Sequence, residues 1–151
     1  MLLPIRISVG LMGLASAIGL GACSQSDSID PDGAKFDAIS PQAQITLIGT
    51  EPGWGMDISQ SDNGDHIARF SSTDDIEGST FAVTRFAGNN GLGFTGTLGD
   101  KSVQVAITPG DCSDGMSDRL YPFVATAALG EAALLGCAYT DGVPFEGSVT
   151  P

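Results

Sequence analysis

Turn residues recur throughout most of this chain and limit the folds that it can adopt. From about Ile39 onward, short apolar runs alternate with clusters of Gly, Asn, Asp and Pro, at spacings of about ten residues. No segment of that length shows a convincing 3.6-residue apolar stripe, so long amphipathic helices are not expected. The spacing predicts an all-β domain.

Eight strands can be placed between these turns. Residues 62–65 (DNGD), 89–91 (NNG) and 99–100 (GD) tolerate positive φ, which favours tight turns between antiparallel neighbours. In residues 101–108 apolar and polar or small side chains alternate, as expected when one face is buried. Closing the sheet would remove its edges, so we predict a small antiparallel barrel of about eight strands. The strands are expected near 43–49, 53–59, 66–71, 79–86, 92–98, 101–108, 122–129 and 132–139.

One segment has an alternative. The alanines of residues 125–133 have high helix propensity, so a helix is possible there. Pro122 before the segment and Gly130 inside it favour two strands and a turn.

The N-terminus has the layout of an export signal. Arg6 precedes an apolar run, residues 7–20, which is rich in Gly, Ala and Ser and short for a membrane span. Residues 20–23 (LGAC) resemble the bacterial lipobox, in which the cysteine is lipidated and becomes the mature N-terminus. We therefore expect a lipoprotein signal peptide at residues 1–22 and a lipid anchor on Cys23. An uncleaved anchor, or a secreted protein with a chance cysteine, is the alternative.

The residues after the lipobox are polar and acidic. Residues 23–37 contain almost no large apolar side chain, so a lipidated, disordered tether is predicted, with the β-barrel domain at 38–151. In the best-known sorting rule, aspartate after the lipidated cysteine favours the inner membrane. Ser24 occupies that position, so we expect an outer-membrane lipoprotein facing the periplasm.

The mature chain would be strongly acidic. The leader contains one of the six basic residues and none of the 18 acidic ones, so the formal charge of −12 becomes −13 after cleavage. Such a surface repels nucleic acid and anionic lipid headgroups, and no nucleic-acid partner is expected. A basic envelope protein is the partner class that the charge leaves open. The acidity can also serve solubility alone.

Two cysteines remain once Cys23 is lipidated. Because the compartment outside the inner membrane oxidises thiols, we expect a disulfide between Cys112 and Cys137. Closing a loop of about 25 residues would contribute about 3 kcal/mol in the chain-entropy description. Metal ligation is the alternative, but no CxxC pair or nearby His accompanies these cysteines. No metal or cofactor is expected.

Two motifs stand apart from generic strand sequence. They are residues 49–54 (GTEPGW) and 111–123 (DCSDGMSDRLYPF), the second followed by Gly-Cys-Ala at 136–138. The chain here resembles uncharacterised bacterial envelope lipoproteins with a G-[TN]-E-P-F-W element and a later C-x-D-G-M-S-D-x-x-Y-P element followed by G-C. The resemblance covers residues 45–138 and departs at Gly53, where the family carries phenylalanine. It implies an envelope location and no known activity, and it implies a fold distantly like META-type and lysozyme-inhibitor β-barrels.

The motifs supply the candidate site. A polar ligand or a partner's side chain could bind where the two motif loops converge at one barrel mouth. In a structural interpretation, Trp54 instead plugs a barrel end. The candidate residues are Glu51, Trp54, Ser117, Asp118, Arg119 and Tyr121.

We also expect an ion pair between Glu51 and Arg119. Arg119 is the only basic residue after Lys101, and its planar guanidinium suits a carboxylate. Asp114 and Asp118 are competing local partners.

The acidic loop around and after Cys112 has an alternative interpretation. Asp111, Asp114 and Asp118 with Gly115 suggest calcium, but the EF-hand spacing and its closing glutamate are missing. A turn at Asp114-Gly115, with Ser117 or Asp118 satisfying loop amides, is the better interpretation.

Catalysis has few candidate groups. The single histidine, His66, begins a strand beside Asp65, and no serine lies in a nucleophile-elbow context. We predict a non-enzymatic binding or accessory module. One alternative is an inhibitor of a periplasmic or cell-wall hydrolase such as lysozyme, with residues 117–119 entering its cleft. Another is a weak cell-wall-modifying hydrolase, which would need Glu51 and His66 in one cleft.

Overall fold

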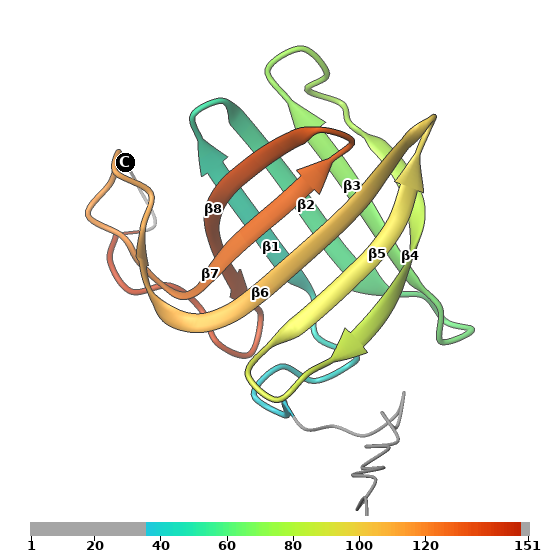
Figure 1. Cartoon of the computed structure of the whole chain (residues 1–151). Coiled ribbons are helices and arrows are strands. Elements are labelled where there is room, and N and C mark those ends of the chain that lie inside the picture. Colours follow the sequence, from blue (N-terminus) through green and yellow to red (C-terminus); the bar gives the residue numbers. More distant parts are fainter. Residues whose placement is uncertain (1–35, 149–151) are drawn as a thin grey trace, which may run out of the picture.

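The eight strands of this protein form one closed antiparallel barrel (Figure 1). The computed structural model describes residues 36–148, and within that range no helix is long and apolar enough to cross a membrane. Each strand pairs with its neighbours in sequence, and β1 pairs with β8 to close the barrel. The strands are β1 (Ile45–Thr50), β2 (Gly53–Gln60), β3 (His66–Ser72), β4 (Ser79–Ala87), β5 (Leu92–Leu98), β6 (Lys101–Ser113), β7 (Leu120–Leu129) and β8 (Ala132–Thr140).

The predicted fold class and number of strands are confirmed. All predicted strand ends agree within two residues except that of β6, which continues to Ser113 rather than ending at 108. The helical alternative at 125–133 is wrong, because this stretch contains the end of β7, a turn and the start of β8. Ala125 and Ala127 line the core at every second position, so barrel packing overrides the helix propensity of alanine.

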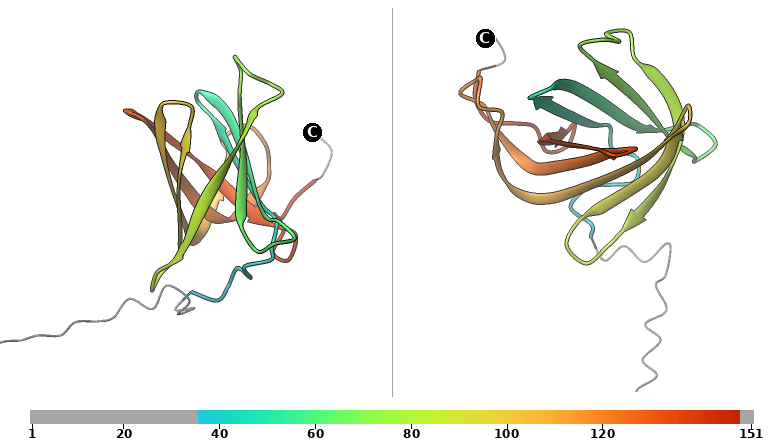
Figure 2. Two further views of the ribbon diagram at one scale, coloured as in Figure 1. Left: turned by 90° about the vertical axis from the view of Figure 1, so that its right-hand side faces the viewer. Right: turned by 45° about the horizontal axis from the view of Figure 1, so that its top comes forward.

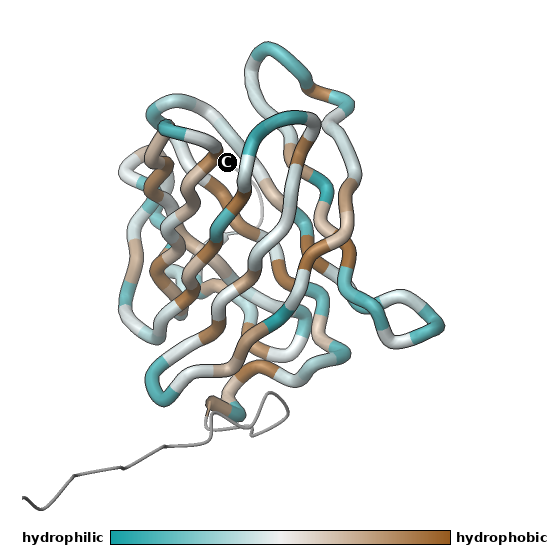
Figure 3. The backbone as a smooth tube through the Cα atoms, turned by 45° about the vertical axis from the view of Figure 1, so that its right-hand side comes forward, coloured by the Kyte–Doolittle hydropathy of each residue, from teal (hydrophilic) through white to brown (hydrophobic). Residues whose placement is uncertain are grey.

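Side chains fill the interior of the barrel. An eight-stranded barrel is just wide enough for this, and alternate residues of every strand point inward. Figure 3 shows the same alternation as short apolar segments along the strands. The largest interior side chains include those of Trp54, Met56, Phe81, Phe94 and Phe123. The places where a ligand could bind are therefore grooves on the outside of the barrel.

The chain before β1 closes one end of the barrel. Phe36 and Ile39 are buried with the core residues, and the Arg85 Nη2 atom donates to the Ile39 carbonyl oxygen at 3.2 Å. His66 Nε2 hydrogen-bonds to the Pro41 carbonyl oxygen at 3.1 Å. Burial lowers the pKa of the Arg85 guanidinium.

This closing segment corrects the predicted domain boundary. Phe36 was expected in the tether, yet its aromatic side chain supplies enough apolar surface to join the core, so the domain includes residues before 38. The predicted signal peptide 1–22, the lipid anchor on Cys23 and the tether up to residue 35 lie outside the described residues.

The β6–β7 hairpin extends beyond the barrel. Its register shifts between Pro109 and Cys112, after which Cys112 and Ser113 pair with Tyr121 and Leu120. We call residues 110–120 the flap. Figure 1 shows the hairpin curving away from the wall and turning back beside it. A bridge between Leu120 and Glu146 joins the flap to the C-terminal segment.

Candidate functional site

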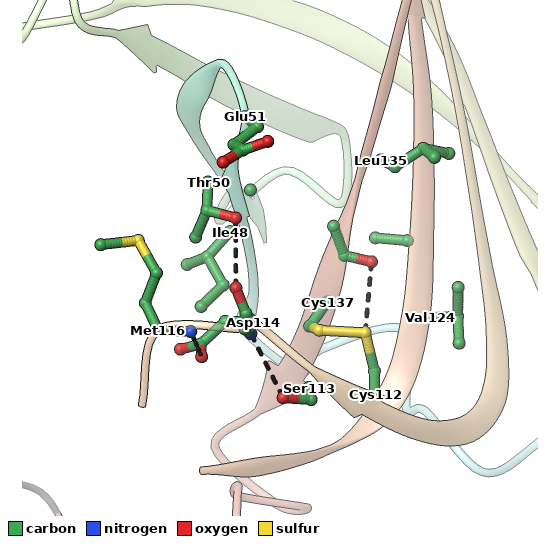
Figure 4. Close-up of a pocket in the computed structure, with 14 residues that line it drawn as sticks. Ile48, Thr50, Glu51, Cys112, Ser113, Asp114, Met116, Val124, Leu135 and Cys137 are labelled. Carbon is green, nitrogen blue, oxygen red and sulfur yellow. Dashed lines mark hydrogen bonds between the residues drawn. A yellow bond between two sulfur atoms is a disulfide. The ribbon is translucent and has the colours of Figure 1, made fainter. Parts of the chain in front are cut away.

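A disulfide fastens the flap to the outer face of β8. Cys112 of the flap is bonded to Cys137, with their Cα atoms 5.6 Å apart, which confirms the predicted pairing. Because Ala138 faces the interior, its neighbour Cys137 faces outward. Cys137 is nevertheless only 1% exposed. The flap therefore covers part of the barrel wall, as Figure 4 shows.

The carboxylate of Asp114 organises the flap. Its Oδ1 atom accepts hydrogen bonds from the amides of Met116 and Ser117 at 2.9 and 2.8 Å. Its Oδ2 atom accepts from the hydroxyls of Ser117 and Tyr121 at 2.7 and 3.1 Å. These bonds, that of the Met116 amide first, lower the pKa of Asp114 to about 2. The loop conformation thus depends on a carboxylate that stays ionised.

The turn predicted at Asp114-Gly115 is confirmed. Gly115 has a φ of 71°, a left-handed conformation that suits glycine. Ser117 Oγ accepts a hydrogen bond from the Arg119 amide at 3.3 Å, which agrees with the predicted role of Ser117. The sequence did not reveal Asp114 itself as the centre of the loop.

Acidification is expected to loosen the flap. Because the pKa of Asp114 is lowered on folding, its stabilising effect is present above the ordinary value of 3.8 and is lost as the pH falls through about 2. The amide resonances of Met116 and Ser117 should shift between about pH 4 and pH 2 in NMR spectra. The control is Asp114→Asn, which has no carboxylate and should lack this step. If wild type and Asp114→Asn titrate alike, Asp114 does not hold the loop.

A groove of about 550 Å³ lies between the flap and the barrel wall (Figure 4). The Thr50 hydroxyl donates to the Asp114 carbonyl oxygen at 3.1 Å and so joins β1 to the flap. Met116 and Leu135 are apolar, 80% and 70% exposed, and stand on its two sides. Glu51 lies at the rim beside Thr50. The groove thus combines apolar surface with a carboxylate.

The predicted site residues do not converge at one barrel mouth. Glu51 is exposed in the turn between β1 and β2, whereas Trp54 is buried inside the barrel. Trp54 Nε1 donates to the Leu135 carbonyl oxygen at 3.2 Å, and its ring stacks on Phe70 with centroids 6.3 Å apart. This agrees with the structural interpretation of Trp54. Of the two candidate residues in the first motif, Glu51 lines the groove and Trp54 does not.

The predicted ion pair between Glu51 and Arg119 is wrong. Arg119 Nε donates to the Ser148 carbonyl oxygen at 2.9 Å, and the guanidinium lies 4.7 Å from the centroid of the Phe145 ring. The returning C-terminal segment places these partners beside the flap. Among residues 36–148, only one ion pair forms between two described side chains, and it joins Arg69 to Asp57 at 3.1 Å.

Tyr121 stabilises the flap through a hydrogen bond to Asp114 and through aromatic packing. It packs with Tyr139 and Phe145, with ring centroids 5.2 to 6.0 Å apart within the trio. Burial raises the pKa of the Tyr121 hydroxyl. The side chains of Ser117 and Tyr121 are therefore both engaged with Asp114, while Asp118 is exposed.

The groups that a hydrolase would need are separated. Glu51 follows the end of β1, and His66 begins β3 at the opposite end of the barrel, beside Pro41. Among residues 36–148 no three His, Cys, Asp or Glu side chains are placed to hold a metal ion.

Comparison with known proteins gives no relative, since no protein family, curated protein or solved structure matches this chain. The resemblance to envelope lipoproteins stays a prediction. Sequence reasoning missed Ile48, Thr50, Met116 and Leu135 as groove residues. Met116 had one available signal, since it is the only large apolar residue among residues 113–119, which are otherwise polar or Gly.

Proposed function

We propose that this chain is an envelope lipoprotein, anchored through Cys23, whose barrel acts as a non-catalytic binding module. The binding site is the groove between the flap and the barrel wall. One observation carries this proposal: the disulfide and Asp114 hold a loop that presents Met116, an exposed apolar side chain, beside that groove.

The chemistry of the groove indicates the kind of partner. Met116 and Leu135 offer adaptable apolar contacts, and an unbranched methionine fits surfaces of varied shape. Glu51 offers a carboxylate at the rim, and the mature charge of −13 attracts basic proteins over a distance. A loop that is already ordered loses little entropy on binding. The partner is therefore a basic envelope protein with an exposed apolar side chain.

A photo-crosslinking amino acid at position 116 tests this site in cells. We expect one dominant adduct with a basic envelope protein, and we expect Glu51→Ala to weaken it. The matched control is position 76, because Ile76 is 82% exposed and lies in another loop. No adduct, or the same adducts from both positions, would contradict the proposal.

The anchor has its own prediction. Cys23→Ser should abolish lipidation, and the protein should leave the membrane fraction or accumulate as unprocessed precursor. Wild-type protein should be labelled by a radioactive fatty acid and sediment with membranes. Normal cleavage and unchanged membrane fractionation of Cys23→Ser would exclude the anchor.

An inhibitor of a basic cell-wall hydrolase is the second candidate. The observation that favours it is the flap itself, an ordered loop with Gly115, Met116 and Asp118 exposed. The purified protein should then inhibit a basic lysozyme, and Met116→Asp should relieve the inhibition. A weak hydrolase is less well supported, because Glu51 and His66 lie at opposite ends of the barrel.

A further inference from the structure

Among the described residues, one side of the barrel wall has only uncharged outward-facing side chains between its hairpin ends. The outward-facing residues of β4 and β5, of β6 up to Thr108, and of the paired parts of β7 and β8 are small, polar uncharged or apolar. Arg85, the one charged residue of β4, turns into the barrel end and binds the Ile39 carbonyl oxygen. On the β2–β3 side, by contrast, Asp57 and Arg69 form an ion pair on the outer face.

A trough runs across this uncharged side. A single row of cross-strand partners, Phe86, Gly93, Ala106, Thr126 and Leu135, spans five strands. Phe86 is 44% exposed and Leu135 is 70% exposed, so two large apolar side chains border a floor of small ones. The row covers four strand spacings, roughly 19 Å. The volume of this trough is about 590 Å³.

The start of the described chain lies next to the trough. Phe36 and Ile39 close the barrel end where β4 finishes, and Arg85, which holds Ile39, is the direct neighbour of Phe86. Figures 1 and 2 show this start beside the turn between β4 and β5. That turn, residues 88–91 (GNNG), is uncharged as well. A lipid on Cys23 would be joined to Phe36 by residues 24–35, a reach of at most about 45 Å.

We propose that the trough side of the barrel rests on the lipid surface, with Phe86 and Leu135 in its interfacial layer. This inference depends on the anchor at Cys23 in the proposed function. The anchor keeps the barrel near the membrane at high effective concentration, so a modest apolar surface is enough for docking.

Charge selects the same side. Carboxylates near anionic headgroups would be repelled and partly desolvated. Among the described residues, no outward-facing strand side chain of the trough side, counted up to Thr108 of β6, is a carboxylate. The neighbouring flap groove shares Leu135 with the trough, so a partner would bind there alongside the membrane.

Tryptophan substitutions in the full lipidated protein test this orientation. Phe86→Trp places an indole in the trough, and Ile67→Trp is the matched control, because Ile67 is 39% exposed on the outer face of β3. Both variants retain Trp54, which is buried and supplies the same background. Each protein is reconstituted into vesicles of phosphatidylethanolamine and phosphatidylglycerol, with or without bromine on the acyl chains.

We expect the fluorescence added by Phe86→Trp to shift to shorter wavelength on vesicles. Brominated acyl chains should quench most of that added fluorescence. Ile67→Trp should show neither change, and Thr126→Glu in the Phe86→Trp background should restore the emission. Absence of quenching in anchored Phe86→Trp protein overturns this inference alone. A wavelength shift that grows with protein density but is not quenched also overturns it, by showing that a second copy covers the trough. Protein that never enters membranes overturns the anchor and this inference together.

Discussion

Gly136→Ala is expected to destabilise the barrel by about 3 kcal/mol or more, because the wall has no room for a methyl group there. A Cβ atom at this position would lie 2.0 Å from the Ile48 carbonyl oxygen and 3.0 Å from Cζ2 of Trp54. The first contact is with backbone where β8 pairs with β1, so no side chain can rotate away to relieve it. Urea unfolding followed by Trp54 fluorescence measures the loss.

The matched control is Gly142→Ala. A Cβ atom at Gly142 would meet only Thr140 Oγ1, at 3.9 Å, which is an ordinary contact. Its backbone is not among the glycines with positive φ. We expect nearly unchanged stability for Gly142→Ala. Equal unfolding curves for the two variants would show that β1 and β8 are not in contact as described.

Removal of the disulfide has the second large effect. The variant Cys112→Ser with Cys137→Ser should lose about 3 kcal/mol of stability, as expected for a loop with a sequence separation of 25 residues. Replacing both cysteines avoids leaving a free thiol at the remaining position. Thermal unfolding with and without reductant gives the measurement, and the double variant should not respond to reductant.

This variant also tests the site. The flap should separate from β8 while the barrel stays closed, because the strand pairs and the apolar core do not involve the sulfur atoms. The crosslink from position 116 should therefore be lost in a protein that is still folded. A retained adduct would mean that the groove does not need the disulfide. Unchanged stability would mean that the disulfide does not stabilise the folded protein.

The sequence by itself determined the class of fold and the strand arrangement. In β6, Val103, Val105 and Ile107 alternate with exposed residues, and a period of two can bury one face only in a strand. Turn residues at regular intervals then required antiparallel neighbours. The number of cysteines and the expected oxidising compartment were enough to predict the disulfide between Cys112 and Cys137. These features depend on the order of neighbouring residues or on the number of cysteines, and the sequence gives both completely.

Tertiary structure alone decided which distant residues meet. Arg119 has Phe145 and the Ser148 carbonyl oxygen beside it, because the C-terminal segment returns along the flap. Trp54 and Glu51 are three positions apart and lie on opposite sides of the wall, since strand alternation begins between them. The trough joins Phe86 of β4 to Leu135 of β8 through the register of four strand pairs. A shift of one residue in any of these pairs would turn side chains to the other face, so their register creates the trough. Closure of the barrel, which pairs β1 with β8, brings Thr50 and Leu135 together at the groove.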